Sequence, residues 1–366
     1  MKWKNQLTGM KPYQPGRSID EVKKMYNLEK IDKLASNENP FGCSPKVQEF
    51  LDNQTINYAL YPDGYAGNLR QALAKVVGVE ETQLLFGNGS DEIIMMISRA
   101  LLQPGVNTVM ATPTFPQYRH NAVIDGAEVR EVQLVNGNHD LQGMLDQIDI
   151  NTAVVWLCSP NNPTGTLIEQ DKLDEFIEKM PKDVLVVLDE AYFEYITAPS
   201  YRSSIELIEK HENVIVLRTF SKAYGLAGFR IGYAVAQEEL INRLDPVREP
   251  FNNTSNSQAV AFIALQDPSF IETCRIQNEA GKKQFADFAT QNRLHMYPTQ
   301  GNFVLIEVKV DSDLAFENLV KKGFIIRSGN ALGTPGYIRV TIGTAQQNKE
   351  FLQRLTEVLR DAEVLA

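Results

Sequence analysis

Short runs of apolar residues alternate with amphipathic patterns through the middle of the chain. The strands that this pattern predicts are Leu84–Phe86, Asn107–Ala111, Glu128–Leu134, Ala153–Cys158, Val184–Leu188, Val214–Leu217 and Ile231–Ala236. The helices predicted around them are Gly67–Val77, Asp91–Leu102, Glu169–Met180 and Gln237–Leu244. Several strands are apolar at every position, as expected of strands that are covered on both faces. The alternation therefore predicts βαβ crossovers and an α/β fold, with a mostly parallel sheet flanked by helices.

The pattern changes from about Phe251 onward. A long helical stretch covers residues 257–292 and is predicted to break near Asp267-Pro268. The elements predicted after it are strands at Asn302–Val308, Gly323–Arg327 and Tyr337–Ile342 and a last helix at Gln346–Leu359. The first forty residues contain three prolines and are typical of an arm. We expect an arm at residues 1–40 that joins a small α+β domain at residues 251–366, and a large cofactor-binding α/β domain at residues 41–250.

Composition and charge narrow the function classes. Of the 366 residues, 43% are hydrophobic and 22% are charged, which is ordinary for a packed globular protein and excludes a disordered, collagen-like or coiled-coil chain. The 46 Asp and Glu residues outnumber the 36 Lys and Arg residues, so the net charge is -10. This charge argues against a general nucleic-acid or acidic-membrane surface.

Neither a membrane span nor a metal site is predicted. No apolar stretch approaches the roughly 20 residues that a bilayer span needs, and the first residues contain no apolar signal core. The three cysteines and four histidines are widely separated, so we expect neither a disulfide framework nor a metal site. A cytoplasmic location is the natural expectation.

Polar residues of types that can bind a ligand or catalyse a reaction follow three of the predicted strands. Asn162 follows the strand that ends at Cys158, Asp189 and Tyr192 follow the next one, and Lys222 follows the third. In a parallel α/β sheet, ligands bind outside the carboxyl ends of the strands. We therefore expect these four side chains to converge on one pocket.

A phosphate site is predicted at Gly87–Glu92, a glycine-rich turn that follows a strand and opens an apolar helix. Free backbone N–H groups at a helix N-terminus bind anions. Thr219 and Ser221 add hydroxyls, and Arg230 can supply a guanidinium. Each feature alone also fits an ordinary turn or helix cap, and the turn is neither a dinucleotide fingerprint nor a P-loop. Their order and placement together favour a phosphate-bearing cofactor.

These motifs resemble those of the fold-type I aminotransferases, which depend on pyridoxal phosphate. The motifs that carry this resemblance are Asn162-Pro163-Thr164-Gly165, Asp189-Glu190-Ala191-Tyr192, Thr219-Phe220-Ser221-Lys222 and Arg230. The resemblance is closer to the histidinol-phosphate aminotransferase branch, through Lys11-Pro12-Tyr13, Leu34–Pro40, Tyr61–Gly64, Gly87–Glu92, Ala223–Gly228, Arg327-Ser328-Gly329 and Tyr337–Thr341. It extends from about Lys11 to Gly343, nearly the whole chain.

The resemblance implies a role for each residue at the cofactor, pyridoxal 5'-phosphate. Lys222 would bind it covalently and then act as the general base, and Asp189 would pair with the protonated ring nitrogen so that the ring can accept electrons. Asn162 and Tyr192 would bind the phenolic oxygen, and Phe115 would stack on the ring. Lys222, Asp189 and Tyr192 are thus the expected catalytic residues. The phosphate would be held by Gly89, Ser90, Asp91, Thr219, Ser221 and Arg230.

The same resemblance implies a partner subunit and a substrate site. Tyr61 is similar to a tyrosine that reaches the cofactor phosphate of the neighbouring subunit, so a homodimer is expected. Arg339 would bind the substrate carboxylate, because a guanidinium suits bidentate recognition. Arg327 and Tyr13 would bind a substrate phosphate, and Asn37 is also expected among the substrate-binding residues.

The implied reaction is transamination of L-histidinol phosphate with 2-oxoglutarate, giving imidazole-acetol phosphate and L-glutamate, in histidine biosynthesis. The same site could instead serve aromatic amino acids or the decarboxylation of a phosphorylated threonine, since a small pocket change alters preference without changing a motif. A third alternative is a cofactor-binding sensor domain of a transcription regulator, without turnover. That alternative needs a DNA-binding extension, and only ten residues precede the family pattern here.

Overall fold

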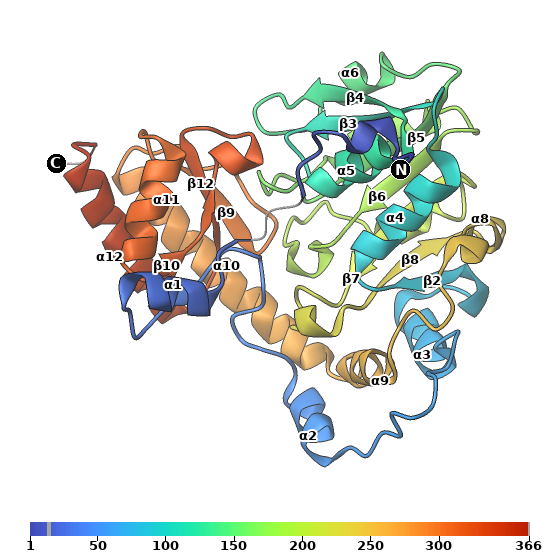
Figure 1. The fold of residues 1–366 in the computed structure, drawn as a ribbon, viewed down its shortest axis with the longest axis horizontal. Helices are drawn as coiled ribbons and strands as arrows, with labels where there is room; N and C mark the ends of the chain where they lie inside the picture. Colours follow the sequence, from blue (N-terminus) through green and yellow to red (C-terminus); the bar gives the residue numbers. More distant parts are fainter. Residues whose placement is uncertain (13–15, 365–366) are drawn as a thin grey trace.

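The computed structural model describes residues 1–12 and 16–364, and its largest element is a seven-stranded sheet (Figure 1). The strand order is β2-β8-β7-β6-β5-β3-β4. Its strands are β2 (Leu84–Gly87), β3 (Asn107–Thr112), β4 (Glu128–Gln133), β5 (Thr152–Cys158), β6 (Leu185–Asp189), β7 (Val214–Thr219) and β8 (Gly232–Ala236). In this sheet β8 runs antiparallel to both neighbours, and the other pairs are parallel. The predicted α/β fold with a mostly parallel sheet is confirmed.

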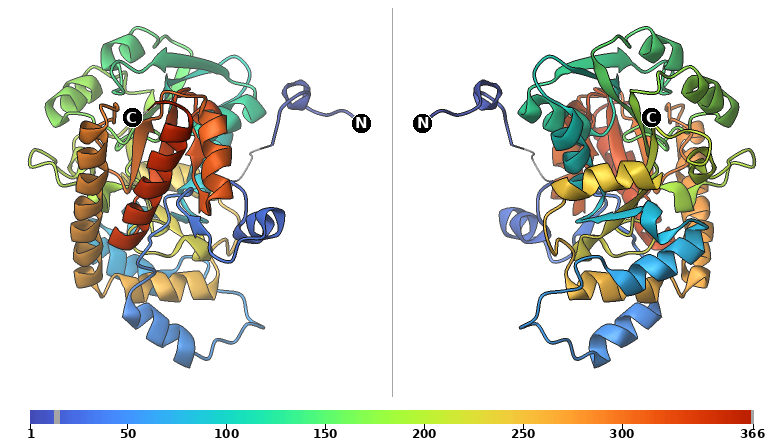
Figure 2. Two further views of the ribbon diagram at one scale, coloured as in Figure 1. Left: turned by 90° about the vertical axis from the view of Figure 1, so that its left-hand side faces the viewer. Right: turned by 90° about the vertical axis from the view of Figure 1, so that its right-hand side faces the viewer.

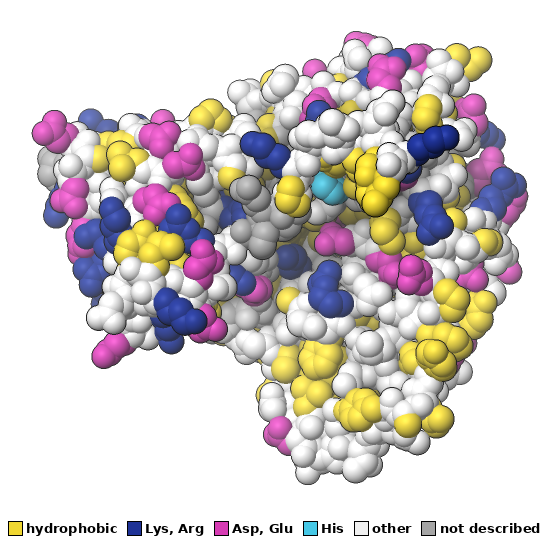
Figure 3. Space-filling view, in the orientation of Figure 1, with side chains coloured by type: hydrophobic (Ala, Val, Ile, Leu, Met, Phe, Trp, Pro, Cys, Tyr) yellow, Lys and Arg dark blue, Asp and Glu magenta, His cyan; other side chains and the backbone are white. Residues whose placement is uncertain are grey.

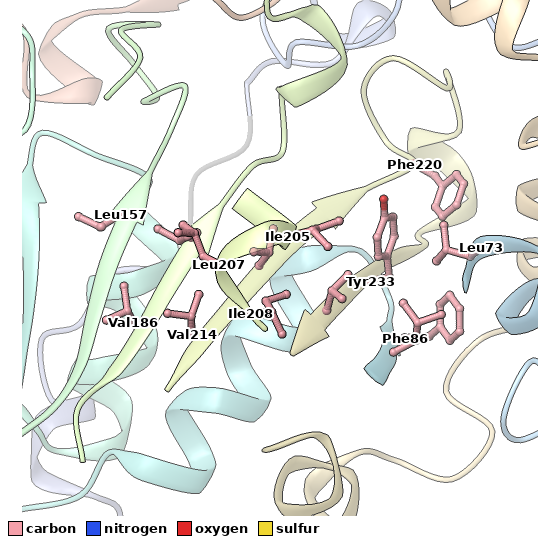
Figure 4. Packing of buried hydrophobic residues seen from close by; sticks show 14 of the residues in the cluster. Leu73, Phe86, Leu157, Val186, Ile205, Leu207, Ile208, Val214, Phe220 and Tyr233 are labelled. Atoms are coloured by element: carbon pink, nitrogen blue, oxygen red, sulfur yellow. The ribbon is translucent and has the colours of Figure 1, made fainter. Parts of the chain in front are cut away.

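Helices cover both faces of this sheet, because successive side chains of each buried strand alternate between two apolar cores. The first core joins Leu157, Val186 and Val214 to the helices α3 (Gly67–Val77), α7 (Gln170–Glu178) and α9 (Ser255–Ala264). Figure 4 shows part of it, with Ile205 and Leu207 facing the strands. The second core joins the other strand face to α4 (Ser90–Leu101), α5 (Pro116–Asp125) and α8 (Glu238–Leu244).

The helices α3, α4, α7 and α8 form where the sequence predicts them, whereas α5 was not predicted. Its ends follow ordinary rules: Pro116 occupies the first turn, where its missing N–H costs nothing, and Gly126 ends the helix with a positive φ of 84°. Its interior pattern is weaker, with Tyr118 and Ala122 as its buried residues. The short helix α6 (Leu141–Leu145) lies beyond β4.

A second, smaller layered unit follows (Figures 1 and 2). Its three-stranded antiparallel sheet has the order β11-β12-β9, with β9 (Phe303–Glu307), β11 (Arg327–Ser328) and β12 (Tyr337–Thr341). The helices that belong to it are α10 (Pro268–Gln291), α11 (Ser312–Lys321) and α12 (Ala345–Asp361). The predicted break near Asp267-Pro268 is confirmed, since α9 ends at Ala264 and α10 begins at Pro268.

The strand predicted at Gly323–Arg327 is wrong as a single element. The chain forms two short strands, β10 (Phe324–Ile325) and β11, that have different partners. β10 pairs in parallel with β1 (Asp32–Lys33), whereas β11 pairs antiparallel with β12. The partner strand changes at Ile326, and this change interrupts the hydrogen bonding between strands. The apolar periodicity within the segment does not reveal which strand each residue pairs with.

The N-terminal segment contacts both layered units. Lys4 donates a hydrogen bond to the carbonyl of Ile124 in α5. Further along, α1 (Ile19–Tyr26) packs its buried Val22 against Val320 and Ile325. The next helix in the sequence is α2 (Pro45–Asn53). The boundaries at residues 40 and 250 stay a proposal, and the side chains of α9 belong to the core of the larger sheet. No helix within residues 1–12 and 16–364 is long and apolar enough to cross a bilayer.

Candidate active site

A cavity of about 260 Å³ lies where the carboxyl ends of β5, β6 and β7 meet the small sheet. Figure 3 shows the molecule hollowed between its two parts, with basic side chains at the hollow. The predicted site residues that line the cavity are Asn37, Gly89, Ser90, Asp91, Phe115, Asn162, Asp189, Tyr192, Thr219, Ser221, Lys222, Arg230, Arg327 and Arg339. The strand-end argument thus identified residues that lie together, from segments far apart in sequence.

Asp189 is the last residue of β6 and is buried, with 3% of its surface exposed. Its Oδ2 accepts a hydrogen bond of 2.6 Å from the Tyr118 hydroxyl, and its Oδ1 accepts one of 3.1 Å from the backbone N–H of Ala191. Burial raises the pKa of this carboxyl to about 6, although both hydrogen bonds oppose the shift. The carboxylate is therefore short of positive partners and suited to a cationic ligand atom.

Lys222 follows β7, the parallel neighbour of β6, and reaches the cavity from the same carboxyl edge of the sheet. Its Nζ donates a 3.0 Å hydrogen bond to the carbonyl of Ser36. Burial first, and then the charge of Arg339, lower the pKa of this amine to about 8. A lowered pKa leaves a larger fraction of the amine neutral near pH 8, which is the form that attacks a carbonyl group or accepts a proton.

A chain of hydrogen bonds links Asn162 and Tyr192, at the edge of the large sheet, to Arg339 of the small sheet. Arg339 of β12 donates to Asn162 Oδ1 at 2.5 Å and to the carbonyl of Ala35 at 2.6 Å. The Tyr192 hydroxyl accepts from the Asn37 amide at 3.0 Å and from the Asn162 amide at 3.4 Å. Because it accepts both bonds, its own proton can be donated to a ligand oxygen. Burial raises the pKa of Tyr192 above its ordinary value, so the hydroxyl stays protonated.

The N-terminus of α4 forms an anion cradle. Gly89 has a φ of 74°, and a Cβ there would lie 2.8 Å from the Arg230 Nη2, so glycine permits this close approach. Arg230 Nη1 donates to Ser221 Oγ at 3.4 Å, and its Nη2 lies 3.9 Å from an Asp91 carboxylate oxygen. Helix N–H groups, a guanidinium and hydroxyls converge here, which is the donor set that a phosphate group requires.

Tyr61 is expected at the site but does not line the cavity. Tyr61 has 81% of its surface exposed and stacks on Phe251, with ring centroids 4.7 Å apart. Its assignment to a neighbouring subunit stays a prediction. Tyr13 lies outside the described residues.

The sequence analysis missed several residues that line or support the cavity. The lining also includes Ala35, Ser36, Gln117, Cys158 and Ala191. Tyr118 supports it from behind through the bond to Asp189. The spacing of three between Phe115 and Tyr118 is one helical turn and would have indicated Tyr118, had α5 been recognised as a helix. Cys158 is paired with Asp189 across β5 and β6, a register that only the sheet reveals.

Comparisons with known proteins agree with this geometry. A family model described as "Aminotransferase class I and II" matches residues 29–355. The chain is 59% identical over 366 residues to a protein named histidinol-phosphate aminotransferase from Lysinibacillus sphaericus, with 100% of both chains covered. It is 55% identical to the protein of that name from Bacillus subtilis strain 168, with 98% of this chain and 100% of the other covered.

Solved structures agree as well. The histidinol-phosphate aminotransferase from Sinorhizobium meliloti, whose structure is a complex with pyridoxal-5'-phosphate, is similar to this chain with a TM-score of 0.89. The sequence identity is 25%, and the match covers 99% of this chain and 98% of that one.

Proposed function

This chain belongs to the aminotransferase class I and II family, and from that premise we propose that it uses pyridoxal 5'-phosphate to transaminate L-histidinol phosphate. The products with 2-oxoglutarate are imidazole-acetol phosphate and L-glutamate, and the biosynthetic direction is the reverse. The names of the relatives at 59% and 55% identity support this substrate. The reaction would serve histidine biosynthesis.

One observation carries the proposal: the cavity brings Lys222 and Asp189 together with two arginines, Arg327 and Arg339. Lysine and aspartate suit the cofactor, and the anion cradle at α4 suits its phosphate. The two arginines line the same cavity, and we assign them to the substrates. Histidinol phosphate carries a phosphate and no carboxylate, whereas 2-oxoglutarate carries two carboxylates. A site that must bind both substrates in turn needs more than one cationic side chain.

The bound cofactor supplies an electron sink for the bonds at the substrate carbon that carries nitrogen. In our proposal, Lys222 tethers the cofactor and moves the proton at that carbon, because a flexible amine with a lowered pKa suits both tasks. Asp189 would hold the ring nitrogen protonated, and Phe115 would stack on the ring. Asn162 and Tyr192 would bind the phenolic oxygen, to which Tyr192 could donate its proton.

We assign the substrate ends to different groups. Arg339 binds a carboxylate, since it is buried at 6% exposure and held in place by Asn162 and Ala35. Arg327, on the adjacent strand β11, binds the substrate phosphate, and Tyr13 adds a hydroxyl. Asn37 completes this side of the cavity. The register pairs Arg327 directly with Arg339, which places the two backbones side by side.

We further propose a homodimer in the cytoplasm. Tyr61 would reach the cofactor phosphate of the partner subunit, and it lies among exposed apolar residues that include Tyr58, Leu60 and Tyr65. Contiguous exposed apolar surface is typical of an interface. The three cysteines are free thiols, which suits a reducing compartment.

A panel of amino donors tests the function. Histidinol phosphate, phenylalanine, tyrosine and phosphothreonine are each assayed with 2-oxoglutarate, and glutamate formation is measured. We expect the highest kcat/KM with histidinol phosphate. A higher value with phenylalanine or tyrosine would favour an aromatic aminotransferase, and carbon dioxide release from phosphothreonine would favour the decarboxylase.

A further inference from the structure

Tyr118 touches two parts of the proposed cofactor seat without lining the cavity itself. It has no exposed surface, and its hydroxyl lies 2.6 Å from Asp189 Oδ2. Its ring meets the Phe115 ring edge-on, with centroids 5.6 Å apart. Phe115 and Asp189 are the residues assigned to the face and the nitrogen of the cofactor ring. Tyr118 thus contacts both of these residues from outside the cavity.

We propose that Tyr118 is the positioning residue that holds the Asp189 carboxylate ionised and aimed at the cofactor ring nitrogen, so that the ring stays protonated. This inference rests on the proposed function, because it concerns how the same cofactor is activated. The physical reason is that a carboxylate in an apolar environment needs hydrogen-bond donors to remain charged.

The hydrogen bond is rigid. The Tyr118 ring stacks on Trp156, with centroids 4.8 Å apart and planes inclined by 13°. The Trp156 Nε1 donates to Thr108 Oγ1 at 2.8 Å, and this hydroxyl donates to the carbonyl of Val154 at 2.8 Å. The phenol is therefore anchored to two strands of the sheet, and the orientation of Asp189 is set before any ligand binds.

Charged and titratable groups around Asp189 do not replace this donor. Asp91 from α4 and Glu190 next in the chain are anions that add to the effect of burial. Cys158 on β5 and Tyr192 beyond β6 both have a pKa that burial raises, so they stay neutral at physiological pH. Burial also raises the pKa of Tyr118 well above its ordinary value, which keeps its proton available for donation.

The chain offers a matched control for the deletion of this bond. Tyr201 donates a 3.0 Å hydrogen bond to Glu190 Oε1, the carboxylate next to Asp189 in sequence, and it does not line the cavity. Tyr118→Phe and Tyr201→Phe therefore each remove one phenol–carboxylate bond, and in each case a single oxygen atom is lost. One bond is directed at the proposed cofactor partner, and the other is not.

The experiment loads wild type and both variants with cofactor labelled with nitrogen-15 in the ring and records its resonance. In Tyr118→Phe we expect the resonance to move toward the value of a neutral pyridine, because the proton moves from the ring to the more basic carboxylate. We expect kcat to fall about tenfold while KM changes little. Tyr201→Phe should leave the resonance and kcat at their wild-type values.

An unchanged resonance in Tyr118→Phe would overturn the inference, whether or not activity falls, because a merely structural residue leaves ring protonation intact. If wild type binds no cofactor, the proposed function itself fails. As a second, independent test, Asp189→Asn is compared with Asp189→Asn/Tyr118→Phe, in which no carboxylate remains for Tyr118 to act on. Equal kcat in these two supports the inference, since Tyr118 acts through the charge of Asp189, and a further fall in the double variant overturns it.

Discussion

The ends of β6 and β7 carry two acid–base pairs with opposite surroundings. Asp189 and Lys222 face the cavity, whereas Glu190, which follows Asp189, and Arg218, four residues before Lys222, form a buried ion pair. In that ion pair, Arg218 donates to Glu190 at 2.9 and 2.7 Å, and Tyr201 adds a third bond. Burial alone would lower the pKa of Arg218, but the attraction of Glu190 raises it above its ordinary value.

In the cavity pair, the interactions that oppose burial are too weak to offset it. Burial raises the pKa of Asp189 to about 6 and lowers that of Lys222 to about 8, so each is shifted toward its neutral form. Two acid–base pairs near the ends of the same two strands therefore have different surroundings. Glu190 and Arg218 satisfy each other, whereas Asp189 and Lys222 are the groups that we propose bind the cofactor. Perturbed pKa values in a cavity distinguish the second situation from the first.

The largest effect is expected from removing the cavity amine. Lys222→Ala should lose about three or more orders of magnitude in turnover, because the nucleophile and the proton carrier vanish together, yet still bind cofactor reversibly. Single-turnover assays measure the loss. In wild type, borohydride reduction and peptide mapping should locate the cofactor on Lys222. An adduct on another lysine would contradict the assignment.

Exchanging the two carboxylates one at a time is the sharpest way to break the comparison. Asp189→Asn should keep the fold and lose most activity, about a hundredfold or more, because a neutral amide cannot hold the ring nitrogen protonated. Turnover and thermal unfolding are measured on the same preparation. Near wild-type turnover would make Asp189 only a turn residue.

Glu190→Gln is the matched control and should show the reverse. It leaves the Arg218 charge buried without its partner, which costs about 3–5 kcal/mol of stability. The molecules that remain folded should turn over at nearly the wild-type rate. Loss of activity without loss of stability in this variant would contradict the distinction between the buried ion pair and the cavity pair.

A smaller effect, confined to one substrate, is expected at the substrate side of the cavity. Arg327→Ala should raise KM for histidinol phosphate about tenfold to a hundredfold, because one charge-assisted phosphate contact is worth about 1.5–3 kcal/mol. A phosphate-free aromatic donor should suffer much less. Equal losses with both donors would mean that Arg327 serves the fold or the carboxylate end.

The smallest effect is expected at the edge of the site. Tyr61→Phe should weaken cofactor retention, at the lower end of about 1.5–3 kcal/mol, through one lost hydrogen bond to the phosphate. Cofactor release during dialysis measures it. Mixing Tyr61→Phe subunits with Lys222→Ala subunits gives hybrid dimers. In each hybrid, the site that retains Lys222 lies in the subunit that carries Tyr61→Phe. This site should regain tight cofactor binding only if Tyr61 reaches it from the partner subunit.

Much of the cavity could be predicted from sequence because its residues stand in short, ordered motifs at the ends of apolar strands. Asn162, Asp189 and Lys222 each follow a strand that is apolar throughout, and the carboxyl ends of parallel strands must meet. Tyr118 could not be predicted in the same way. It contacts Asp189 from a helix, and the two residues are 71 positions apart in the chain. A local sequence pattern does not predict a contact over that separation.

The sequence by itself determined the strands of the large sheet, the break before Pro268 and the residues at the strand ends, because each depends on local periodicity or on one residue's backbone limits. Only the tertiary structure decided how the chain divides between partners, as where β10 and β11 pair with different strands. It also decided which of two neighbouring carboxylates meets an arginine. Contacts between distant segments follow from packing, and packing is set by the whole fold rather than by any one segment.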